Sequence, residues 1–143
     1  QYEVTVLYRQ LSTLLEMRHS AYDFGSQDNA GQKFRAAHQE LLDVDMLILD
    51  EVCVNETVLK KNSQSWLGNL LRQRLVNKKN CILITNHNLG DLEQALGRYC
   101  FESIKEYDTY KVRFSGPSRR KGLTLDEEDQ VTSAPRYQPN QVR

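Results

Sequence analysis

Two short, uninterrupted apolar runs constrain the fold of this chain more than any other feature. The first is MLIL at Met46 to Leu49, and the second is CILIT at Cys81 to Thr85. Apolar runs of this length are typical of strands buried on both faces, which occur in parallel sheets. Between them, apolar residues recur at helical spacing: Val58, Leu59, Trp66, Leu67, Leu70, Leu71 and Leu75. A strand, a helix and a second strand in this order predict an α/β fold with a parallel sheet.

Residues before the first run extend the same pattern. The segment YEVTVLY, Tyr2 to Tyr8, is rich in β-branched and aromatic residues and predicts a strand. Ser12 is placed to cap a short helix, and the apolar spacing from Ala30 to Leu42 predicts another helix.

After the first run, Asn55 is expected to cap the long helix. Asn88 or Leu89 is expected to begin a further helix that ends at Gly97, because glycine commonly terminates helices. The alternating residues of Tyr110 to Phe114 predict a final strand.

The domain organisation follows from composition. A length of 143 residues suits one domain or a piece of a larger one. Apolar content falls sharply after Pro117, and the tail contains the acidic run DEED. We therefore expect residues 1–116 to form the folded core and residues 117–143 to form a flexible tail that is first basic and then acidic.

Charge, hydropathy and cysteine content exclude several classes of protein. The 19 basic and 19 acidic side chains give no net charge, which excludes a polycation that coats nucleic acid. The longest apolar runs are far shorter than the roughly 20 residues of a membrane span, and no secretory leader is evident. The three cysteines lack C-x-x-C spacing, so they are interpreted as reduced thiols of a cytoplasmic protein.

Two adjacent carboxylates follow the first apolar run. In MLILDE, Asp50 and Glu51 come at the carboxyl end of the predicted strand, where ligands of such sheets bind. Asp50 could hold a magnesium ion through a water molecule, while Glu51 polarises a water aimed at a γ-phosphate. The alternative is a strand that merely ends in polar residues.

The second apolar run delivers Asn86 to the same edge of the sheet. An uncharged amide there can orient the attacking water or contact the γ-phosphate. Alternatively, Asn86 caps the following helix, although Asn88 is better placed to do so. The predicted topology brings Asp50, Glu51 and Asn86 together.

With these motifs in place, the sequence resembles a known family. DVDMLILDEV, then a basic helix, then CILITNHNLGDLEQALG resemble the AAA+ ATPases of the DnaC type, the bacterial and phage helicase loaders, with the IstB transposition helpers as close relatives. The resemblance covers roughly Tyr2 to Arg120. It implies a P-loop NTPase core in which Asp50 and Glu51 match the Walker B pair and Asn86 matches the sensor 1 residue.

The resemblance also implies cofactors and partners. These are ATP and Mg²⁺, single-stranded DNA, a replicative helicase of the DnaB type, and other subunits of the same chain. The implied function in DNA replication is ATP-dependent delivery or opening of the helicase ring. An IstB-like transposition helper is the alternative within the class. A binding module that does not hydrolyse ATP is the alternative from another class.

Two departures from the family pattern affect this interpretation. No G-x-x-x-x-G-K-[ST] loop occurs in the 143 residues, and such a loop cradles and neutralises the phosphates. We expect the chain to begin inside the domain and, alone, to be inactive. The second departure is Ser103, which stands where the family has an arginine that acts on a neighbouring subunit's nucleotide. Arg98 or Lys105 would have to replace that arginine.

A cluster of cations lies near the carboxyl end of the sequence: Lys111, Arg113, Arg119, Arg120 and Lys121. By the resemblance, Arg119 or Arg120 approaches the nucleotide. Alternatively, Lys111, Arg113 and Lys121 contact DNA phosphates, or the cluster is a solvated strand edge. The long helix also carries or adjoins cations that could line a DNA channel or simply face solvent: Lys60, Lys61, Arg72, Arg74, Lys78 and Lys79.

Overall fold

The computed structural model describes residues 2–23, 29–54 and 58–117. The chain divides into two units, Gln1–Tyr110 and Lys111–Arg143. The helices and strands described below all belong to the first unit.

The first unit contains a small parallel sheet, as the apolar runs predict. Its strands are β1 (Val6–Gln10), β2 (Met46–Asp50) and β3 (Asn80–Leu83), and they lie in the order β1-β2-β3. In the register, Tyr8 lies opposite Ile48, which in turn lies opposite Ile82. The α/β class with a parallel sheet is therefore confirmed.

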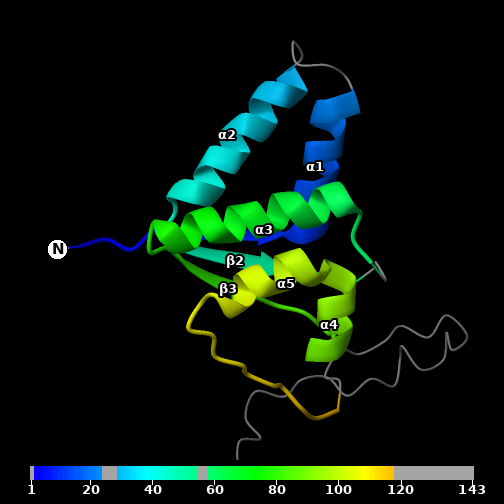
Figure 1. The fold of residues 1–143 in the computed structure, drawn as a ribbon. Helices are drawn as coiled ribbons and strands as arrows, with labels where there is room; N and C mark the ends of the chain where they lie inside the picture. Colours follow the sequence, from blue (N-terminus) through cyan, green and yellow to red (C-terminus); the bar gives the residue numbers. More distant parts are fainter. Residues whose placement is uncertain (1, 24–28, 55–57, 118–143) are drawn as a thin grey trace, which may run out of the picture. The chain divides into compact units, whose positions relative to one another are not determined.

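Helices connect the strands and follow the sheet. They are α1 (Leu11–Asp23), α2 (Asn29–Asp43), α3 (Lys61–Val76), α4 (Leu89–Leu96) and α5 (Arg98–Lys105). Figure 1 shows α1, α2 and α3 on one side of the strands. None of the helices in the described ranges has the length and apolar character to cross a membrane.

The two faces of the sheet differ in burial. On the helix side, Leu47 and Leu49 of β2 have no exposed surface and belong to the main core. On the opposite side, Val6, Tyr8 and Ile82 keep between 44% and 60% of their surface exposed. Successive side chains of a strand alternate between faces, so Asp50 lies on the more open face together with Ile48.

Several predicted boundaries are confirmed and others are wrong. Helix α2 and helix α4 match their predictions, and the Asn88 side chain accepts a hydrogen bond from the Asp91 N–H as the cap of α4. The first strand begins at Val6 and not at Tyr2. Ser12 does not cap α1, because that helix already begins at Leu11.

The long helix also begins later than predicted. It starts at Lys61, with Lys60 at its N-cap position and no side-chain hydrogen bond there. Asn55, the predicted cap, lies outside the described residues. Helix α5 was not predicted, because Gly97 was interpreted only as the end of α4. Gly97 in fact joins the two helices at a positive φ of 77°.

The predicted final strand is wrong. Residues 110–114 have no strand structure, and Tyr110, Val112 and Phe114 are at least three-quarters exposed. A strand requires a hydrogen-bonded neighbour, and none of the described strands pairs with this segment. The alternating pattern was correctly observed but lacks the partner that would make it a strand.

Arg74 corrects the prediction for the long helix most sharply. The sequence placed it with the cations of a solvated face, but its side chain has no exposed surface. Its guanidinium donates to the carbonyl oxygens of Leu41 (2.5 Å), Val44 (2.9 Å), Asp45 (3.3 Å) and Asn80 (2.6 Å). Arg74 therefore ties α3 to the segments that lead into β2 and β3.

The thiol of Cys81 completes the surroundings of this arginine. Arg74 Nε lies 3.2 Å from Cys81 Sγ, which is also 3.8 Å from the Tyr107 hydroxyl. That hydroxyl donates to the Leu71 carbonyl at 2.5 Å, and burial raises the pKa of Tyr107. The buried guanidinium thus lies in a polar network that links α3, β3 and the segment after α5.

Gly68 allows α5 to lie directly against α3. A Cβ atom at Gly68 would lie 2.8 Å from Cε1 of Tyr99 and 3.3 Å from Cα of Cys100. The Tyr99 hydroxyl also donates to Asn69 Oδ1 at 2.6 Å. A larger residue at Gly68 would force the two helices apart, so this glycine has a packing role.

The half-buried His38 of α2 gives the fold a measurable dependence on pH. Its Nδ1 accepts a hydrogen bond from Trp66 Nε1 at 3.3 Å, and burial lowers the pKa of His38 below the ordinary 6.5. The unfolded chain therefore binds this proton more readily, so the contribution to stability is complete above about pH 6.5 and decreases as the pH falls further.

We expect the fluorescence of Trp66, the single tryptophan, to change as His38 is protonated, and the free energy of unfolding to fall over the same range below pH 6.5. Measuring both quantities between pH 8 and pH 5 tests this. In His38→Gln, the change in fluorescence should disappear. The same transition in that variant would assign it to another group.

Candidate functional site

The carboxyl ends of β2 and β3 are held together by hydrogen bonds that continue beyond the strands. The Ile84 N–H donates to the Leu49 carbonyl at 2.8 Å, and the Val52 N–H donates to the Ile84 carbonyl at 2.9 Å. The Thr85 hydroxyl then donates to the Val52 carbonyl at 2.8 Å. The segments that carry Asp50, Glu51 and Asn86 therefore meet at one edge of the sheet.

His87 adds a contact that the sequence did not reveal. Its Nε2 lies 2.7 Å from the Cys53 carbonyl oxygen, and its N–H donates to the Thr85 hydroxyl at 3.2 Å. His87 thus joins the loop after β2 to the loop after β3. The sequence gave only its position next to Asn86 as a signal.

The loop after β2 has an unusual backbone. Glu51 and Cys53 have positive φ angles of 53° and 62°, a region that glycine adopts more readily than other residues. Cys53 stands where the resembling family has glycine, and its φ explains why glycine suits the position. The turn directs Glu51 away from the line of the strand.

Asp50 is held by two donors. The Tyr8 hydroxyl donates to Asp50 Oδ2 at 2.5 Å, and the Glu51 N–H donates to Asp50 Oδ1 at 2.7 Å. The hydrogen bond to Asp50 raises the pKa of Tyr8, and desolvation and the charges of Asp50 and Glu51 act in the same direction. The Asp50 carboxylate is therefore oriented toward β1.

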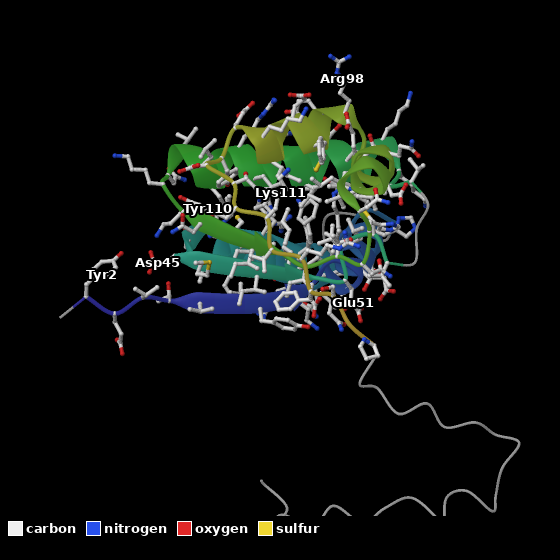
Figure 2. The ribbon with its side chains drawn as sticks, turned by 90° about the horizontal axis from the view of Figure 1, so that it is seen from below. Tyr2, Asp45, Glu51, Arg98, Tyr110 and Lys111 are labelled. Atoms are coloured by element: carbon white, nitrogen blue, oxygen red, sulfur yellow. The ribbon has the colours of Figure 1, made fainter. Side chains whose placement is uncertain are left out.

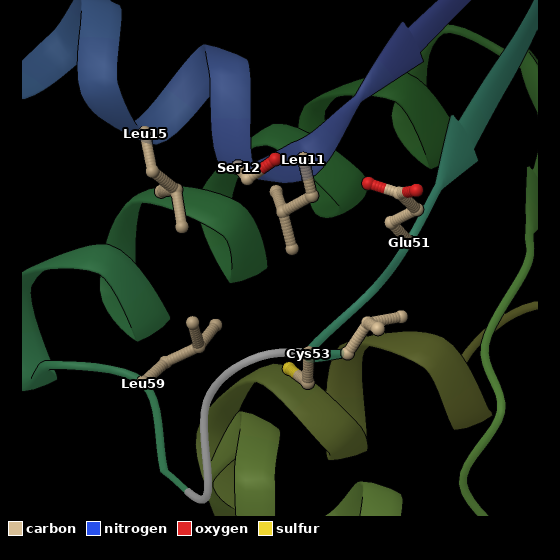
Figure 3. A pocket seen from close by; sticks show the side chains of 7 residues that line it. Leu11, Ser12, Leu15, Glu51, Cys53 and Leu59 are labelled. Atoms are coloured by element: carbon tan, nitrogen blue, oxygen red, sulfur yellow. The ribbon is translucent and has the colours of Figure 1, made fainter. Parts of the chain in front are cut away.

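Glu51 faces a different space from Asp50. It lines a small hollow of about 30 Å³ together with Leu11, Ser12 and Leu59, as Figure 3 shows. This space has room for one or two water molecules and not for a nucleotide. Glu51 is exposed, so its carboxylate can act on water next to α1.

Asn86 is exposed at the same edge as the two carboxylates. The capping of α4 is performed by Asn88, whose Oδ1 accepts from the Asp91 N–H at 2.9 Å. The alternative that Asn86 is the helix cap is therefore wrong. Its amide is left at the edge of the sheet, where the sequence predicted it.

The described residues offer limited means to hold a metal ion. They contain no group of three or more His, Cys, Asp or Glu side chains suited to a metal. Magnesium in nucleotide sites is commonly held by one or two carboxylates, water and phosphate oxygens. The oriented carboxylate of Asp50 fits that arrangement as a single protein ligand acting through water.

Ser103 does not occupy a subunit-facing position. It has no exposed surface, and its hydroxyl donates to the Tyr99 carbonyl at 3.0 Å within α5. Lys105 is exposed and paired with Glu102 at 3.1 Å. Arg98 points away from the body of the unit (Figure 2), so it is the better placed of the two candidate replacements to contact another subunit.

The remaining predicted cations separate into two groups. Lys111 and Arg113 are exposed and belong to the second unit. Arg119, Arg120 and Lys121 lie outside the described residues. On the long helix, Arg72 is paired with Glu106 at 3.1 Å, so it is less available to DNA than the sequence suggested.

Comparison with known proteins adds no family assignment. No protein-family model matches the sequence, and no curated protein matches it.

Proposed function

We propose that this chain is the acidic part of a AAA+ ATPase site and belongs to a helicase loader of the DnaC type. The observation that carries the proposal is the joining of the loops after β2 and β3, which brings Asp50, Glu51 and Asn86 to one edge of a parallel sheet. Ligands of open α/β sheets bind at this edge. The proposed biological role is ATP-dependent delivery or opening of a replicative helicase on single-stranded DNA.

Each residue has a distinct role in the proposal. Asp50 holds hydrated Mg²⁺, Glu51 accepts a proton from the attacking water, and Asn86 contacts the γ-phosphate. The water-sized hollow beside Glu51 supports its role, and the two hydrogen bonds to Asp50 support an oriented metal ligand. Bound Mg²⁺ would neutralise charge on the phosphates.

An IstB-like transposition helper would use the same residues. A binding module without hydrolysis is the second candidate from another class, and one observation favours it. The buried Ser103 presents no side chain to a neighbouring subunit, so that position cannot supply a cation to a nucleotide bound there. An ATPase would need Arg98 or another group for this purpose.

The 143-residue chain alone is expected to bind ATP weakly. It contains no phosphate-binding loop, so the backbone N–H groups and lysine that hold the phosphates are missing. Isothermal titration of the chain with Mg²⁺–ATP should give no micromolar binding. A micromolar or tighter dissociation constant would contradict this prediction.

The proposal itself is tested in a form of the protein that extends upstream of Gln1 through a G-x-x-x-x-G-K-[ST] loop. We expect ATP binding that depends on Mg²⁺ and ATP hydrolysis that single-stranded DNA stimulates. Binding without hydrolysis would favour the non-hydrolysing module. No binding of Mg²⁺–ATP would contradict both candidates.

A further inference from the structure

We propose that Tyr8 is a positioning residue that fixes the Asp50 carboxylate for a hydrated Mg²⁺ ion. This inference rests on the proposed function, because it concerns the same site. It is carried by the 2.5 Å hydrogen bond from the Tyr8 hydroxyl to Asp50 Oδ2. The Glu51 N–H holds the other oxygen, Oδ1, at 2.7 Å, so both oxygens of the carboxylate are restrained.

The register of the sheet explains how Tyr8 reaches Asp50. Tyr8 lies opposite Ile48, and the next residue of β2 on the same face is Asp50. Tyr8 and Asp50 are thus diagonal neighbours on adjacent strands, a separation that a long aromatic side chain can span. Both lie on the more open face of the sheet, where Tyr8 keeps 49% of its surface exposed.

Fixing the carboxylate matters because a metal held through water depends on the direction of its acceptor. Without the hydroxyl, Asp50 keeps its charge and its bond to the Glu51 N–H but gains freedom to rotate. In Tyr8→Phe, the ring and its packing remain while one hydrogen bond is lost. A hydrogen bond of this kind contributes on the order of 1 kcal/mol, which corresponds to about a fivefold change in affinity.

Tyr99→Phe is the matched control. The Tyr99 hydroxyl also donates one hydrogen bond to a side chain, Asn69 Oδ1 at 2.6 Å. That bond joins α3 to α5 and does not involve Asp50. Both substitutions remove a hydroxyl from a partly exposed tyrosine, so they differ mainly in the partner that is released.

The test is a titration of the isotope-labelled 143-residue chain with Mg²⁺, followed by the NMR signal of the Glu51 backbone amide. We expect the half-saturating Mg²⁺ concentration to rise about 3- to 10-fold in Tyr8→Phe, to stay unchanged in Tyr99→Phe, and to become unmeasurable in Asp50→Asn. Equal or tighter binding in Tyr8→Phe would overturn the inference alone. No response in the wild-type chain would contradict the proposed metal site, and the inference with it.

Discussion

Replacing Arg74 by methionine is expected to lower the free energy of unfolding by about 3 kcal/mol or more. The guanidinium is fully buried and donates to four backbone carbonyl oxygens that belong to two separate segments. Methionine fills similar space but donates no hydrogen bond, so buried acceptors lose a donor at a cost of about 1 kcal/mol or more each. Urea unfolding followed by Trp66 fluorescence measures the loss.

Arg72→Met is the control for this prediction. Arg72 lies on the same helix, but its ion pair with Glu106 joins side chains that are 36% and 46% exposed. Its guanidinium also lies 4.4 Å from the centre of the Tyr99 ring. Exposed ion pairs and cation–π contacts are each worth about 1 kcal/mol or less. Equal losses in Arg72→Met and Arg74→Met would contradict the structural role assigned to Arg74.

Arg74 also shows why part of the fold could not be predicted. A charged residue on an amphipathic helix is normally solvated, and the pattern around Arg74 gives no sign of burial. The carbonyl groups that bind it come from Leu41, Val44, Asp45 and Asn80, and backbone groups leave no signal in a sequence. Only the packing of α3 across the amino ends of β2 and β3 reveals them.

The strands that carry the candidate site were easier to predict. Uninterrupted apolar runs identified β2 and β3, and helical spacing with a capping Asn88 identified α4. The edge where Asp50, Glu51 and Asn86 lie follows from this topology alone. The direction of each side chain does not, because it depends on the positive φ of Glu51 and on the hydroxyl of Tyr8.

The predicted strand at residues 110–114 failed for a related reason. Alternation of apolar and polar residues describes one strand, whereas a sheet needs a second strand in hydrogen-bonding contact. Among the described residues no strand pairs with this segment. Local patterns therefore predicted the elements whose partners are present and overpredicted the one whose partner is not.

Glu51→Gln is expected to lower the kcat of ATP hydrolysis by about 100-fold or more while Mg²⁺–ATP binding is retained. Glutamine preserves the size of the side chain but cannot accept a proton from the attacking water. Because the Glu51 side chain faces a hollow that holds only water, its contribution to nucleotide affinity should be small. The measurement requires the form of the protein that carries the phosphate-binding loop.

Glu102→Gln provides a matched control. It removes a carboxylate from α5, where Glu102 forms an exposed ion pair with Lys105. This substitution makes the same chemical change outside the candidate site. Its rate of hydrolysis should equal that of the wild type within about twofold, since exposed ion pairs contribute little to stability.

The rate of DNA-stimulated ATP hydrolysis in wild type, Glu51→Gln and Glu102→Gln tests the central proposal most directly. The proposal predicts a large loss of kcat in Glu51→Gln alone, with ATP still bound. Hydrolysis at the wild-type rate in Glu51→Gln would contradict the role of Glu51 and the ATPase site built around it.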